Sequence, residues 1–190
     1  MWHDDRVHVA FKNNLLWLVF FLLAPPLSLG LGIFLNQGFK ELRFIKSLFF
    51  FPFVISPVVV GIIFSWFYNP KYGLLDSFLV GAGLESVALL SNEDLVSFGI
   101  IIAAMWPQVA YCLILYMTGL AGLNQEMIEA GRIDGAKGWP MFWNIILPQL
   151  KPATFIAIVV SVLGALRRYD LIAIMTQGGP WGSSTVLAYE

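Results

Sequence analysis

The residues from Asn14 to Leu35 form an apolar run that contains no charged side chain. As an α-helix rising about 1.5 Å per residue, a run of about 22 residues extends roughly 33 Å, enough to cross the hydrocarbon core of a bilayer. The composition agrees, because 58% of the 190 residues are hydrophobic and only 12% are charged. A soluble domain is nearer 45–50% apolar and about a quarter charged. We therefore predict an all-α integral membrane protein.

Three further apolar segments have comparable lengths, so we expect four helices, at about 14–35, 47–68, 97–120 and 152–175. Several of these segments contain prolines. In a membrane bundle a proline more often kinks a helix than ends it, because neighbouring groups satisfy the carbonyl that it frees. The prolines concerned are Pro25, Pro26, Pro52, Pro57 and Pro107. The sequence predicts a polytopic transmembrane helical bundle in a single domain covering residues 1–190.

The basic residues of the short loops predict the orientation in the membrane. The loops at 36–46 and 121–151 carry three Lys or Arg each, whereas the loop at 69–96 carries only Lys71. Because short basic loops stay in the cytoplasm, these two loops are expected on the cytoplasmic side. Both termini then face outward. Acidic residues near the start argue against a cleavable signal peptide, so we expect a further helix to precede this chain.

The loop at 121–151 contains signals for two short helices. Asn124 is a favourable N-cap, and either Gly135 or Gly138 can supply the left-handed residue that ends a helix. Pro140 suits the first turn of a second short helix. On these residues alone, the loop is equally well explained as an interfacial connector or as a docking site for another protein.

The residues from Glu129 to Pro152 read EAGRIDGAKGWPMFWNIILPQLKP. This order resembles the EAA loop of binding-protein-dependent ABC importer permeases, although Gly131 stands where the second Ala of the motif is usual. The resemblance implies that this loop docks into a cytoplasmic ATPase and couples ATP hydrolysis to transport. It assigns that coupling role to Glu129, Ala130, Gly131, Asp134, Gly135, Ala136, Leu147 and Pro148.

The C-terminal residues LIAIMTQGGPWGSSTVLAYE resemble a segment of the carbohydrate permease subgroup. The likeness is carried by Thr176, Gly178, Gly179, Pro180 and Thr185. Asn13-Asn14 and Phe51-Pro52 also fit this subgroup. The resemblance therefore implies a carbohydrate-like substrate. The Gly178-Gly179-Pro180 turn is expected in an outer loop that contacts the binding protein or gates release, or else is a plain turn.

The resemblance also implies a multi-pass protein of a prokaryotic inner (plasma) membrane, surrounded by lipid and working with three kinds of partner. These are a cytoplasmic ABC ATPase dimer, a second permease subunit and an extracytoplasmic solute-binding protein. The chain has no GxxxxGK[ST] phosphate loop, so we expect a transport subunit rather than an enzyme, with ATP hydrolysed by a partner. Family members have six helices, so a helix is expected to be missing at each end.

A charged cluster interrupts the last apolar segment, at Arg167, Arg168, Tyr169 and Asp170. Charges at membrane depth are costly and usually face a cavity or a partner. Only about 15 residues separate the start of this segment from the cluster, fewer than the ~20 that span a bilayer. We therefore favour a place on the translocation pathway, with Tyr169 stacking on a sugar. The alternative is a position at the outer headgroups.

Other functions remain as alternatives: a permease for a non-sugar solute, an ion-coupled carrier or channel, or a non-functional fragment. A carrier or channel predicts charges within several spans, but the first three apolar segments contain none. No nucleophile–base pair indicates an enzyme, and no cofactor is implied. His3 and His8 lack the Cys or acidic neighbours of a metal site. A net charge of −1 gives no support for nucleic-acid binding.

Overall fold

The computed structural model describes residues 5–36, 42–186 and 188, and the side chains of 8–36, 44–186 and 188. Every regular element in these residues is helical, which confirms the predicted all-α class. Two of the described helices are long and apolar enough to cross a membrane, and there are four such spans if each of two bent pairs counts as one. Lys40 of the first basic loop and His3 lie outside the described residues.

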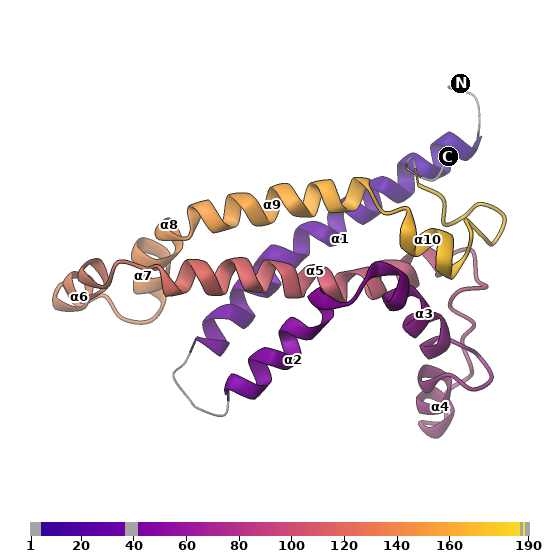
Figure 1. Cartoon of the computed structure of the whole chain (residues 1–190), viewed down its shortest axis with the longest axis horizontal. Coiled ribbons are helices and arrows are strands. Elements are labelled where there is room, and N and C mark those ends of the chain that lie inside the picture. The colour runs from indigo at the N-terminus through magenta and orange to yellow at the C-terminus, as the bar shows by residue number, and fades with distance from the viewer. Residues whose placement is uncertain (1–4, 37–41, 187, 189–190) are drawn as a thin grey trace.

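The centre of the bundle is formed by α1 (Asp5–Leu35), α5 (Val96–Ala121) and α9 (Lys151–Leu166), as Figure 1 shows. Both long helices continue through their internal prolines, as predicted. One turn beyond the proline pair of α1, the Ser28 hydroxyl donates to the Val109 carbonyl of α5 at 2.9 Å. Trp17 and Phe21 of α1 are fully buried in the same hydrophobic core as Ile100 and Ile101 of α5.

The segment at 47–68 is not one continuous helix, so the prediction of a single helix there is wrong. It divides into α2 (Leu42–Val54) and α3 (Pro57–Phe67), which are bent by 104°. Pro57 begins α3, where its missing N–H costs nothing. The Ser56 hydroxyl caps this helix by accepting from the Val59 N–H at 3.4 Å. Pro57 therefore starts a new helix instead of kinking an existing one.

The last predicted span is also divided. α9 ends at Leu166, and α10 (Asp170–Met175) follows as a separate short helix, so the prediction of one helix over 152–175 is wrong. α10 packs closely on α3, since a Cβ added at Gly61 would lie 3.1 Å from Ile174 Cγ2. This contact holds the two short helices together beside the bundle.

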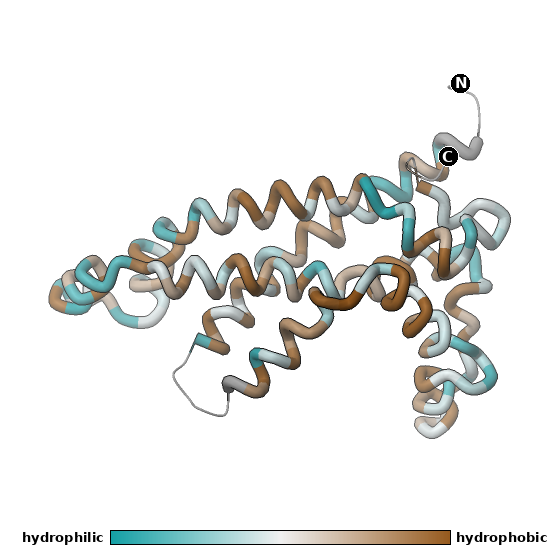
Figure 2. The backbone as a smooth tube through the Cα atoms, viewed as in Figure 1, coloured by the Kyte–Doolittle hydropathy of each residue, from teal (hydrophilic) through white to brown (hydrophobic). Residues whose placement is uncertain are grey.

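The two ends of the bundle are formed by different parts of the chain. At one end, α6 (Gln125–Ile133) lies far from both termini (Figure 1). Leu120, at the same end of α5, lies 3.5 Å from the Cβ position of Gly32 in α1, so the flanks of both basic loops share this end. At the other end, the Asn13 amide donates to the carbonyls of Ser183 and Thr185, at 2.7 and 2.8 Å. Figure 2 shows hydrophobic residues along the helices and polar ones gathered at both ends.

α4 (Leu74–Gly81) lies at the edge of the molecule beyond α3 (Figure 1). Its N-cap is Gly73, whose carbonyl accepts from the Ser77 hydroxyl at 3.0 Å. The chain then returns to α5 through the irregular residues 82–95. α4 therefore lies apart from the sites described below.

Candidate functional site

α6 is a short helix with a well-formed cap at each end. At its start the Asn124 side chain accepts hydrogen bonds from the N–H groups of Glu126 and Met127, at 2.8 and 3.3 Å. At its end Gly135 has a φ of +84°, so it supplies the left-handed residue. The Gly135 N–H donates to the Arg132 carbonyl and the Ala136 N–H to the Gly131 carbonyl, as in a Schellman motif. Both predicted caps are confirmed, with Gly135 in the C-terminal role.

The second half of the loop is helical but irregular. It comprises α7 (Trp139–Met141), the π-helix η1 (Phe142–Ile146) and α8 (Leu147–Gln149). The expected start at Pro140 is therefore close to the observed one, and the helical segment continues one residue beyond Pro148. The axis then turns by 70° into α9.

Gly131 faces this second half of the loop. It is buried, and a Cβ at this position would overlap Ile145 Cδ1 and lie 3.5 Å from Met141 Cε. The backbone of α6 therefore rests directly on η1. The resemblance placed Gly131 among residues that meet the ATPase, whereas its missing side chain leaves room for a contact within the loop.

Gln149 braces the loop, and sequence reasoning missed it. Its Oε1 accepts from the Asn124 N–H at 2.9 Å, and its Nε2 donates to the Ile145 carbonyl at 3.1 Å. These bonds fasten the start of α6 to the end of η1. No sequence signal identifies this role, because the partners are set by the fold of the whole loop.

The outer face of α6 is accessible. Glu129, Ala130 and Asp134 are exposed, and Ile133 is 87% exposed. Sequence reasoning also missed Ile133, although an isoleucine between charged residues on a short polar helix is a usable signal for a binding surface. Leu147 and Ala136 are half-buried and Pro148 is exposed, so these three lie outside the face formed by α6.

A polar contact lies at the midpoint of α5. Gln108 is 4% exposed, and its Nε2 donates to the Ser161 hydroxyl of α9 at 3.1 Å. Arg168, from the break between α9 and α10, donates from Nη2 to Gln108 Oε1 at 3.2 Å. The guanidinium carbon lies 4.9 Å from the centroid of the Phe21 ring, a cation–π distance.

Two cavities adjoin this contact, with volumes of about 290 and 240 Å³. Both are lined by Gln108, Val160 and Arg168. The larger one is also bounded by Pro57, at the break between α2 and α3, and by Tyr111 of α5. The break between α2 and α3 and the break between α9 and α10 therefore lie beside one cavity, whose mostly apolar lining includes the Gln108–Arg168 contact.

The structure separates the four residues of the predicted charged cluster. Arg168 is half-buried against Gln108 and lines both cavities. Arg167 is exposed at the edge of the smaller cavity. Tyr169 and Asp170 are exposed, and neither lines the two cavities. Gln108, which sequence reasoning missed, joins Arg168 in their place.

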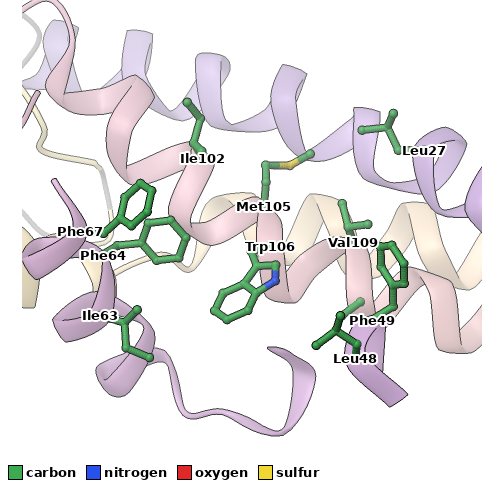
Figure 3. Close-up of a pocket in the computed structure, with 11 residues that line it drawn as sticks. Leu27, Leu48, Phe49, Ile63, Phe64, Phe67, Ile102, Met105, Trp106 and Val109 are labelled. Atoms are coloured by element: carbon green, nitrogen blue, oxygen red, sulfur yellow. The ribbon is translucent and has the colours of Figure 1, made fainter. Parts of the chain in front are cut away.

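A larger groove of about 700 Å³ opens between α1, α2, α3 and α5. Figure 3 shows Phe64, Trp106 and Leu48 around it. Its lining is apolar or aromatic throughout, so it suits hydrocarbon better than a hydrophilic solute. We do not place the polar pathway there.

The C-terminal turn is closed by its own side chains. The hydroxyls of Thr176 and Ser184 are 2.8 Å apart, and Ser184 donates to the Gly179 carbonyl at 2.7 Å. Gly178 is buried with a φ of +80°, and Pro180 is half-buried. Trp181 is 94% exposed beside them. The turn therefore presents a tryptophan at the end of the molecule opposite α6.

The sequence of this chain matches that of a known protein family. The sequence profile described as "Binding-protein-dependent transport system inner membrane component" matches residues 24–190. The chain belongs to this family of ABC transporter permeases. Its members are multi-pass inner-membrane proteins, and the chain is accordingly a transport component and not an enzyme.

Individual relatives agree with this assignment. The chain is 32% identical over 194 residues to the probable ABC transporter permease protein YurN of Bacillus subtilis, covering 99% of this chain and 66% of that protein. It is 29% identical to the trehalose/maltose transport system permease protein MalF of Thermococcus litoralis, covering 98% and 62%. The chain thus spans about two thirds of the length of these relatives.

A solved structure shares the fold. A crystal structure of a bacterial ABC transporter involved in the import of the acidic polysaccharide alginate superimposes with a TM-score of 0.88. The alignment covers 99% of this chain and 67% of that one, at 22% sequence identity. The broken helices and the irregular loop therefore occur within a known permease fold.

Proposed function

We propose that this chain is the permease subunit of an ATP-driven importer and forms, with a second permease subunit, the membrane pathway for a carbohydrate or related solute. The observation that carries this proposal is α6, a braced helix with an open outer face at the basic end of the bundle. Relatives are named for trehalose/maltose, osmoprotective compounds and sn-glycerol-3-phosphate. A carbohydrate or polyol is the cargo class that fits these names together with the C-terminal motif.

In this proposal α6 docks into a cytoplasmic ATPase subunit. Glu129 supplies a charged contact and Ile133 an apolar one, with Ala130 and Asp134 beside them. Gly131, Gly135 and Gln149 act indirectly, because they hold the helix against η1. Ala136 completes the C-cap through its amide, and Leu147 and Pro148 lead from the loop toward α9.

The cargo would pass through the two adjoining cavities that Gln108 and Arg168 both line, which we call together the Gln108–Arg168 cavity. Arg167, Tyr169 and Asp170 would lie toward its outer rim. A solute-binding protein would deliver it at the end that carries the Gly178-Gly179-Pro180 turn and Trp181. A bacterial alginate ABC transporter has been solved in complex with an alginate pentasaccharide-bound periplasmic protein, and one chain of that complex shares this fold. Exposure of Trp181 supports a contact at this end.

Co-purification with the cognate ATPase tests the proposal. Glu129→Ala and Ile133→Ser should each reduce the amount of ATPase recovered with the transporter in detergent. Removing one side of a buried charged contact commonly costs about 2–5 kcal/mol of binding, so the loss for Glu129→Ala should be at least tenfold. Glu93→Ala, which removes another exposed carboxylate in the loop between α4 and α5, is the matched control.

The control should leave ATPase recovery unchanged. If no ATPase co-purifies with the unaltered protein, or if both loop variants behave like Glu93→Ala, then α6 is not the coupling surface.

A further inference from the structure

We infer that the Gln108–Arg168 cavity binds an acidic solute, namely a carbohydrate or polyol that carries a carboxylate or phosphate group. This inference rests on the proposed transport role and concerns only the chemical class of the cargo. Its evidence is the local chemistry around Arg168.

The position of the cavity is that of a solute site. α5 is long enough to cross a bilayer, and Gln108 lies at its midpoint. Helices break at Ser56–Pro57 and between Leu166 and Asp170, and both breaks lie beside the larger cavity. Irregular backbone at membrane depth is tolerated where it is covered by protein or lines a cavity. Discontinuous helices near the midplane are where transporters commonly hold their substrates.

The Arg168 guanidinium is under-satisfied at this site. It has five N–H donors, and one of them bonds to Gln108 Oε1 at 3.2 Å. Its Nε is buried and has no hydrogen-bond partner among the described residues. The Phe21 ring offers only a weak interaction with its face. An acceptor placed in the cavity would complete the hydrogen bonding of this side chain.

The charge of Arg168 is only partly offset by its surroundings. The neighbouring carboxylate, Asp170, interacts electrostatically with Arg168 but is itself exposed to solvent. The remaining lining of the larger cavity is mostly apolar, and it includes an aromatic pair in which the Phe53 and Tyr111 rings stack at 5.2 Å.

In mostly apolar surroundings a cation without a close partner is costly, and an anion offsets that cost where a neutral hydroxyl does not. A guanidinium also matches carboxylate and phosphate oxygens two at a time. The two adjoining cavities, of about 290 and 240 Å³, approach the size of a small-molecule site. The aromatic pair supplies a flat apolar wall for the carbon face of a sugar or polyol. Acidity of the cargo is therefore the property that Arg168 selects.

Direct binding to the complete transporter in lipid nanodiscs, without the solute-binding protein, tests this inference. The probes are glucuronate and glucose at equal ionic strength, and sn-glycerol 3-phosphate against glycerol. We expect binding of each acid and at least tenfold weaker binding of its neutral partner. Arg168→Gln should weaken binding of the acids at least tenfold. Lys71→Gln, which removes an exposed positive charge from the outer loop, should change nothing.

Arg168→Lys controls for a folding defect, because it keeps the positive charge but lacks the planar guanidinium. This variant should still prefer acids to neutral probes, with weaker binding. Equal binding of acid and neutral probes, or acid binding that survives Arg168→Gln, would overturn the inference. If the proposed transport role is wrong, the unaltered protein will instead fail to co-purify with an ATPase. An Arg168→Gln transporter that still retains its ATPase isolates the effect on the cargo.

Discussion

Replacing Gly135 by alanine tests how much the end of α6 depends on a left-handed backbone. The φ of Gly135 is +84°, and a Cβ added there meets no atom within 4 Å. The substitution therefore introduces no clash, and its cost is the conformational penalty of about 1–2 kcal/mol for an L-residue in this region. A residue forced out of that region would lose the Schellman hydrogen bonds of Gly135 and Ala136.

The corresponding measurement is hydrogen exchange of the purified protein, followed by mass spectrometry of peptides covering residues 125–136. Because 1.4 kcal/mol is a factor of ten, exchange in α6 should accelerate by about 5- to 30-fold. Gly135→Asn should have a smaller effect, since asparagine tolerates the left-handed region better. The matched control is Gly30→Ala in α1, where the added Cβ also meets nothing within 4 Å and φ is ordinary. Equal α6 exchange in Gly135→Ala and Gly30→Ala would refute the reasoning.

Gly119→Val should lower the apparent Tm in detergent, because a Cβ there would lie 2.9 Å from Leu150 Cδ2. The expected overpacking cost is about 1–3 kcal/mol. A Tm equal to that of Gly30→Ala would contradict this close approach of α5 and α9. Gln149→Ala should leave the Asn124 N–H without its acceptor, costing about 1 kcal/mol and giving roughly fivefold faster exchange at the start of α6; unchanged exchange would remove Gln149 as a brace. Asn13→Ala removes both side-chain hydrogen bonds to the C-terminal turn and should therefore speed proteolysis within 176–186. A cleavage rate equal to that of Lys12→Ala, a variant at an exposed neighbouring position, would show that Asn13 does not hold this turn in place.

The parts of the fold that sequence predicted are those fixed by short-range chemistry. A long apolar run without charges specifies a spanning helix, and α1 and α5 follow directly from it. The caps of α6 depend on the side chain of Asn124 and the backbone freedom of Gly135, and both can be predicted from the residue type. The EAA-like order added the location of the loop within a known fold.

The features that sequence missed are decided by residues far apart in the chain. Arg168 and Gln108 are separated by 60 positions and meet only because α9 packs along α5. Proline at position 57 is compatible with either a kinked helix or the start of a new one. The structure shows a new helix, which is capped by Ser56 and packed against α10. The inward orientation of Gly131 is likewise visible only once Ile145 is placed. Sequence patterns report local preference, whereas these contacts are set by packing.

The relation between the two candidate sites follows from α9, which begins at the end of the loop and ends beside the cavity. At its start Leu150 is fully buried and close to Gly119 of α5, and farther along Ser161 bonds to Gln108. Packed interiors resist deformation, so α5 and α9 should move as one body when α6 is displaced. α3 and α10 lie beyond the two helix breaks and pack on each other, so they form the natural opposing wall. In the proposed importer, ATP-driven displacement of α6 would therefore change the cavity by shifting Gln108 and Arg168 relative to α3 and α10.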